Sequence, residues 1–114
     1  MKSTRWFRFK NDINRVMTEQ ALGAFLKQSR MNVGLSQKEV AMVLGYKSSQ
    51  FVSNWERGLS SPPVATFRRL CELYRTNEHE MFDRLRAMAV KKLEDDLKRE
   101  FFGPEAHEEA LAVE

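Results

Sequence analysis

The chain has 114 residues and a formal net charge of +3, and its length predicts one domain with tails rather than several domains. It contains no apolar run of 18 residues, so we expect no membrane span and no membrane partner. Its one cysteine, Cys71, excludes an internal disulfide, and the charged N-terminus argues against a secretory signal, so we expect a cytoplasmic protein.

The first 17 residues are basic and aromatic, with Trp6, Phe7 and Phe9 set among lysines and arginines. This segment is too short to fold independently. One interpretation is an N-terminal arm that follows the phosphate backbone of DNA or enters its minor groove. The other is that the three aromatic rings pack on the folded domain or on a partner chain.

Residues 19–32 form the first predicted helix, with Thr18 as its N-cap residue and Gly34 just after its end. Apolar residues recur along it at helical spacing and predict one buried face. These residues are Leu22, Phe25, Leu26 and, near the end, Met31.

Residues 35–58 predict two short helices joined by a tight turn. Ser36 and Glu39 have the spacing of a capping box, in which each side chain bonds the backbone amide of the other residue. The first short helix therefore starts at Ser36. Gly45 ends it, because glycine adopts left-handed backbone angles without steric cost.

The second short helix is unusually polar on its outer side. Ser48 or Ser49 can cap it, and we expect it to run to Arg57. Phe51, Val52 and Trp55 are expected to point inward. The residues that we expect to point outward are short donors and acceptors that can reach base edges in the DNA major groove. They are Ser49, Gln50, Ser53 and Asn54.

A fourth helix is predicted to start within residues 60–63, because proline is tolerated in the first turn of a helix, and to end at Tyr74 or Arg75. Cys71 lies on its apolar face with Phe67 and Leu70. We therefore interpret Cys71 as a small core residue rather than a reactive thiol.

The last predicted helix covers residues 78–102, with Asn77 and Glu80 as a capping pair. Such a helix is longer than a compact domain can cover, so only its first half, through Leu85, is expected to close the core. The second half is strongly charged but carries Leu93 and Leu97 on one stripe. That stripe predicts a covering partner, either a second copy or the N-terminal aromatic residues; a solvated extension is the alternative.

The 35–58 stretch resembles the helix-turn-helix of the Cro/C1-type (Xre, lambda-repressor-like) DNA-binding family. The matching residues are Leu35-Ser36-Gln37, Glu39-Val40-Ala41, Leu44-Gly45 and Val52-Ser53-Asn54-Trp55-Glu56-Arg57-Gly58. The resemblance covers about residues 22–85. It implies an all-α fold: a compact five-helix helix-turn-helix domain, here with an extended C-terminal helix. One residue more than in the family pattern lies between Gly45 and Trp55, so the start of the recognition helix can shift by one position.

The resemblance also implies roles for individual residues. Base edges would be read by Ser49, Gln50 and Asn54, with Ser48 and Ser53 as marginal members because of the extra residue. The DNA backbone would be contacted by Gln37, Lys47 and Arg57. An ion pair between Arg30 and Glu56 would tie the first helix to the third. The alternative is that Arg30, Gln50 and Asn54 are ordinary solvent-facing residues.

The distribution of charge agrees with a phosphate-facing N-terminal half, although charge also fluctuates along any chain. Residues 1–58 contain ten Lys/Arg and four Asp/Glu, a balance of +6, whereas residues 59–114 have a balance of −3. We divide the chain into a basic and aromatic arm (1–17), the helix-turn-helix domain (18–86), a helical extension suited to dimerisation (87–103) and an acidic, mobile tail (104–114).

These features predict a sequence-specific transcriptional regulator, a repressor, that binds an inverted-repeat operator in double-stranded DNA as a homodimer. The alternative is an antitoxin or another protein-interaction module that binds a partner protein through its C-terminal helix. We predict no enzyme, no catalytic residues, no metal and no cofactor. His79 and His107 lie 28 residues apart, and we interpret the five glycines as isolated helix terminators rather than a phosphate-binding loop.

Overall fold

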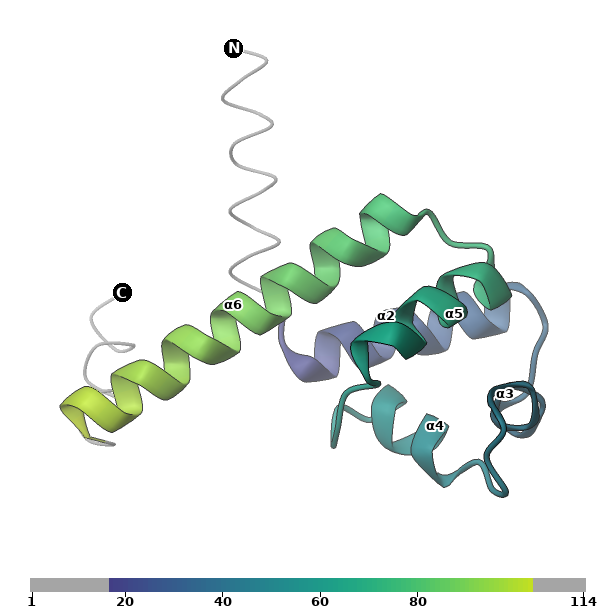
Figure 1. The fold of residues 1–114 in the computed structure, drawn as a ribbon, viewed down its shortest axis with the longest axis horizontal. Helices are drawn as coiled ribbons and strands as arrows, with labels where there is room; N and C mark the ends of the chain where they lie inside the picture. Colours follow the sequence, from purple (N-terminus) through teal and green to yellow (C-terminus); the bar gives the residue numbers. More distant parts are fainter. Residues whose placement is uncertain (1–16, 104–114) are drawn as a thin grey trace, which may run out of the picture.

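The computed structural model describes residues 17–103, which form five α-helices and no strand (Figure 1). The helices are α2 (Glu19–Asn32), α3 (Gln37–Leu44), α4 (Gln50–Glu56), α5 (Val64–Tyr74) and α6 (Glu78–Phe102). The predicted all-α class and the long C-terminal helix are confirmed. The aromatic residues of the predicted arm, the acidic tail and His107 lie outside the described residues.

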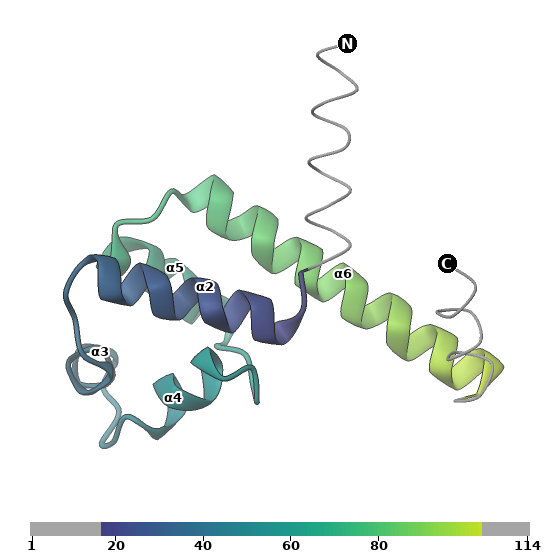
Figure 2. The same cartoon turned by 180° about the vertical axis from the view of Figure 1, so that it is seen from behind.

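Helices α2 and α5 lie between α6 and the α3–α4 pair, as both views show (Figures 1 and 2). All five helices contribute side chains to one core. The buried apolar residues are Met17, Leu22, Leu26, Val40, Ala41, Val52, Trp55, Phe67, Leu70, Cys71, Tyr74, Met81, Ala87 and Met88. This arrangement holds the inner face of α4 against α2, and within residues 17–103 no helix covers its outer face.

Three helices begin where their capping residues predict. The Thr18 hydroxyl accepts a hydrogen bond from the Ala21 amide at 3.0 Å. Ser36 and Glu39 form the complete capping box, because the Glu39 amide donates to Ser36 Oγ and the Ser36 amide donates to Glu39 Oε1, both at 3.0 Å. The start of α6 is fixed in the same way, by Asn77.

The predicted polar helix is one residue too long at its end. Of the two serines expected to cap its start, Ser48 makes a bond, because its Oγ accepts from the Gln50 amide at 3.4 Å. Helix α4 ends at Glu56, and Ser49 occupies the N-cap position without a side-chain capping bond. Phe51 was expected inside but is 53% exposed. The buried residues are Val52, Trp55 and Glu56, at spacings of three and four, and Phe51 lies outside that stripe.

The interpretation of all five glycines as helix terminators was wrong for Gly23, which lies inside α2. A Cβ atom at this position would lie 2.4 Å from the carbonyl oxygen of Trp55 and 2.6 Å from that of Glu56. Glycine is therefore required for the close approach of α2 to the last turn of α4. The other four glycines do follow helices and have positive φ angles.

Burial along α6 continues to Met88, slightly beyond the expected limit at Leu85. The helix then passes the start of α2, where Lys92 pairs with Glu19, and its last turns project away from the other helices (Figure 1). Met31 was assigned to the buried face of α2 but is 54% exposed, whereas the assignment of Cys71 to the core is confirmed. Among residues 17–103, no helix has both the length and the apolar character needed to cross a bilayer.

Candidate nucleic-acid interface

The outer side of α4 and its two flanking turns carry seven of the eight residues that the sequence predicts to contact DNA; the eighth, Gln37, lies on α3. Lys47, Ser48, Gln50 and Arg57 are exposed, and Ser49, Ser53 and Asn54 are half-buried. None of these seven side chains is enclosed by the core. On α4, Gln50, Ser53 and Asn54 lie on the side away from the buried stripe of Val52, Trp55 and Glu56.

Three of these side chains are joined in one hydrogen-bonded network. Asn54 Oδ1 accepts from Gln50 Nε2 at 2.9 Å and from an Arg57 guanidinium nitrogen at 2.8 Å. The sequence predicted that Gln50 and Asn54 would share a face, since they are one helical turn apart. It did not indicate that Arg57, assigned to the DNA backbone, also orients Asn54.

The network leaves the hydrogen-bonding groups that base reading requires. Each carboxamide nitrogen carries two hydrogens. Gln50 Nε2 can therefore stay bonded to Asn54 and donate its second hydrogen to N7 of adenine, while Gln50 Oε1 accepts from the adenine N6 amino group. Because both neighbours donate to Asn54 Oδ1, the Asn54 amide nitrogen is the group that remains for an acceptor on DNA.

Beneath this surface, the structure brings Arg30 and Glu56 together. Arg30 Nε donates to Glu56 Oε2 at 2.7 Å, and a terminal guanidinium nitrogen donates to Glu56 Oε1 at 3.1 Å. The other terminal nitrogen donates to the Leu35 carbonyl at 2.8 Å. One arginine thus connects α2, the residues before α3 and the last turn of α4.

Gln37 lies beside the same ion pair. Its Nε2 donates to Glu56 Oε1 at 2.9 Å, a contact that sequence reasoning missed when it assigned Gln37 to a DNA phosphate. The hydrogen bond to Glu56 raises the pKa of Arg30, which keeps the guanidinium charged. Burial raises the pKa of the nearby Tyr74 phenol, so this ring stays neutral against the pair.

Aromatic stacking supports the turn between α3 and α4. The Tyr46 ring lies 4.8 Å from the Phe51 ring and 5.8 Å from the Trp55 ring, measured between centroids. The exposed Phe51 therefore covers Tyr46 instead of entering the core. Sequence reasoning assigned no role to Tyr46, although an aromatic residue directly after a helix-ending glycine was an available signal.

The charge of this surface suits a polyanion. The charged residues of segment 36–58 are Lys38, Glu39, Lys47, Glu56 and Arg57. Glu56 is neutralised by Arg30, and Glu39 is engaged in the capping box. Lys38, Lys47 and Arg57 are exposed, and so is the charged Glu39, so three cations outnumber one anion and the outward charge is positive.

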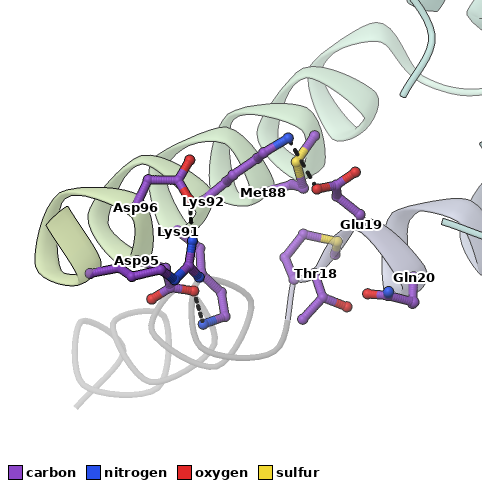
Figure 3. Close-up of a pocket in the computed structure, with 10 residues that line it drawn as sticks. Thr18, Glu19, Gln20, Met88, Lys91, Lys92, Asp95 and Asp96 are labelled. Carbon is purple, nitrogen blue, oxygen red and sulfur yellow. Dashed lines mark hydrogen bonds and ion pairs between the residues drawn. The ribbon is translucent and has the colours of Figure 1, made fainter. Parts of the chain in front are cut away.

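A pocket of about 370 Å³ lies elsewhere, between the start of α2 and the second half of α6 (Figure 3). Its cationic side chains are paired with carboxylates: Lys91 with Asp95 at 3.1 Å, Lys92 with Glu19 at 3.2 Å and Arg99 with Asp96 at 3.1 Å. The pocket therefore adds no free positive surface. Across residues 17–103, no three His, Cys, Asp or Glu side chains are grouped as a metal site requires.

Comparison with known protein families identifies the family of this chain. The model of a family described as a helix-turn-helix domain, within the Cro/C1-type group, matches residues 21–85. The matched region is more than half of the chain and runs from the first turn of α2 into α6. No curated protein and no solved structure matches the chain.

Proposed function

The chain belongs to the helix-turn-helix domain family, a family of DNA-binding domains in which enzymes are not typical, and from that membership we propose a sequence-specific transcriptional regulator. In this proposal the protein represses transcription by occupying an inverted-repeat operator as a homodimer. The observation that supports it most directly is the ordered polar network on the outer face of α4.

Gln50 and Asn54 are the base readers in this proposal. Their mutual hydrogen bond fixes both carboxamides before DNA arrives, which lowers the entropic cost of binding. A carboxamide that pairs twice with adenine contributes about 1–3 kcal/mol of discrimination against other bases. Ser49 is the third base reader, with Ser48 and Ser53 at the margin.

Lys47 and Arg57 flank the network and contact the DNA backbone. Both are exposed cations, and such contacts fix the position of the domain without reading sequence. Gln37 contributes through the second hydrogen of Nε2, since the first is bonded to Glu56. Two copies would place their α4 helices about 34 Å apart, one turn of DNA.

A protein-interaction function is the second candidate. The C-terminal half of α6 exposes a row of large apolar residues, which favours contact with another protein. An antitoxin would combine such a surface with binding to its own promoter. A stoichiometric partner whose capture requires residues 86–114 would favour this candidate, whereas α6 contacts limited to a second copy would count against it.

Selection of bound duplexes from a random DNA pool tests the proposed function. We expect enrichment of an inverted repeat whose half-sites lie one helical turn apart. Enrichment of isolated half-sites would support base reading by α4 and contradict binding as a dimer. A pool that stays random, despite salt-dependent binding, would contradict sequence-specific regulation.

A further inference from the structure

One face of α6 carries an apolar stripe that nothing in residues 17–103 covers. Val90, Leu93, Leu97 and Phe101 follow one another at spacings of three or four, and each is between 48% and 83% exposed. Buried Met81 and Met88 lie on the opposite side of the helix, against the core. The stripe is therefore a second apolar face, and soluble helices usually have only one.

A hollow of about 370 Å³ lies near the N-terminal end of this stripe, between α5 and α6. Its lining is mostly apolar and consists of Val64, Phe67, Arg68, Cys71, Glu78, Met81, Phe82 and Leu85. Val64 and Phe82 are 74% and 57% exposed, so the hollow opens to the surface. Phe82 lines the hollow and lies about two helical turns before Val90, with the guanidinium of Arg86 between them, 5.9 Å from the centroid of the Phe82 ring.

Charge is segregated along α6 after its acidic first turns, which contain Glu78, Glu80 and Asp83. Residues 84–92 contain four cations and no acid, whereas residues 94–100 contain four acids and two cations. Within the described residues, Arg86 forms an ion pair with the exposed Asp83 at 3.3 Å and lies over the Phe82 ring, and Glu100 forms no ion pair. A helix of this kind repels a parallel copy of itself and attracts an antiparallel one.

We propose that α6 pairs antiparallel with α6 of a second copy of this chain, and that Phe101 of each copy docks at the α5–α6 hollow of the other. Arg86 and Glu100 are each seven residues from Leu93, so a crossing at Leu93 places them opposite one another. At 1.5 Å per residue, Phe82 and Phe101 lie about 16 Å and about 12 Å from that crossing, on opposite sides. Because the two helices run in opposite directions, Phe101 of one copy lies on the same side of the crossing as Phe82 and the hollow of the other copy.

A second copy fits these features because one sequence supplies both halves of each contact. A two-fold interface needs a self-complementary surface, in which residue i meets residue j and residue j meets residue i. Helix α6 meets that requirement, because its basic block can contact the acidic block of a second copy and its exposed Phe101 ring can contact the hollow of that copy. The proposal deepens the dimer of the proposed function and is independent of which bases α4 reads.

Sedimentation equilibrium of the full chain without DNA tests the pairing. We expect a dimer whose dissociation constant rises at least about tenfold in Leu93→Glu, because a carboxylate would be buried in the interface. Phe101→Ala should weaken the dimer, while Phe102→Ala, at the adjacent but off-stripe position, should not. Met42→Glu, an exposed apolar position on α3, is the control for added charge. Circular dichroism checks that each variant remains helical.

Charge reversal tests the orientation. Arg86→Glu and Glu100→Arg should each weaken the homodimer, and an equal mixture of the two variants, like the double variant, should restore it. A wild-type chain that stays monomeric, or an Arg86→Glu variant that dimerises more tightly, would overturn the proposal. DNA selection is read separately, so a monomer that still enriches half-sites would overturn this pairing and leave base reading intact.

Discussion

The guanidinium of Arg30 holds the carboxylate of Glu56 through two hydrogen bonds, of 2.7 and 3.1 Å, inside the domain. Their side chains are 11% and 3% exposed. The residues lie on α2 and α4, so the pair fixes the last turn of α4 relative to the rest of the body. Arg57 and Asn54, which belong to the candidate interface, adjoin that turn.

Removing one member of this pair should destabilise the folded domain. Glu56→Ala leaves a buried guanidinium without its partner, and we expect the free energy of unfolding to fall by about 3–5 kcal/mol. Urea denaturation measures this change. Asp96→Ala, which breaks the exposed pair with Arg99, is the matched control and should cost no more than about 1 kcal/mol. Equal losses in the two variants would contradict a special role for the buried pair.

Gly23→Ala should destabilise the domain, although alanine is normally the better helix former by about 1 kcal/mol. The new methyl group would meet the Trp55 and Glu56 carbonyl oxygens, and backbone atoms cannot move aside cheaply. We expect a net loss of about 1–3 kcal/mol in thermal or urea unfolding. Ala24→Ser, at the exposed neighbouring position, should change stability by less than about 0.5 kcal/mol. A stabilised Gly23→Ala variant would refute the close approach.

The sequence predicted those features that depend on local chemistry. Thr18, Ser36 and Asn77 start helices through bonds to residues three positions away, so short-range patterns were sufficient. The close contact at Gly23 could not be predicted, because it depends on a carbonyl more than thirty residues distant. The outward position of Phe51 likewise follows from its packing on Tyr46, which only the folded turn creates.

In the candidate site, too, local contacts could be predicted from the sequence and long-range contacts could not. The shared face of Gln50 and Asn54 follows from helical periodicity, whereas the bond from Gln37 to Glu56 spans 19 residues and needs the tertiary fold. Pairing of Arg30 with Glu56 came from the family resemblance and not from spacing. Met88 is buried because of the way α2 crosses α6. The periodicity of the sequence does not define that crossing.

Acid should weaken the start of α3 through Glu39. Its bonds with Ser36 lower its pKa below the ordinary value of 4.5. The stabilisation that Glu39 contributes is therefore complete above pH 4.5 and is lost as the pH falls through the lower folded-state value. Glu39→Gln removes the titration, so stability measured by urea denaturation should depend less steeply on pH below 4.5. If stability below pH 4.5 depends on pH equally in Glu39→Gln and in the wild type, Glu39 does not contribute to the acid sensitivity of the fold.

Lys47→Ala should weaken binding to all DNA sequences by a similar factor. Loss of one phosphate contact should lower the slope of log binding constant against log salt concentration by about 0.9. Binding isotherms over a range of salt concentrations, on an enriched and a scrambled duplex, measure this slope. Lys98→Ala on α6 is the control and should leave the slope unchanged. A Lys47→Ala loss confined to one sequence would contradict backbone contact.

The most direct test of the central claim is the affinity of Gln50→Ala for an enriched operator, its single-base variants and a scrambled duplex. If the outer face of α4 reads bases, Gln50→Ala should lose about 1–3 kcal/mol on the operator, relax the preference at one base pair of each half-site, and bind scrambled DNA as wild type does. Equal weakening on every duplex, with all base preferences retained, would contradict the account.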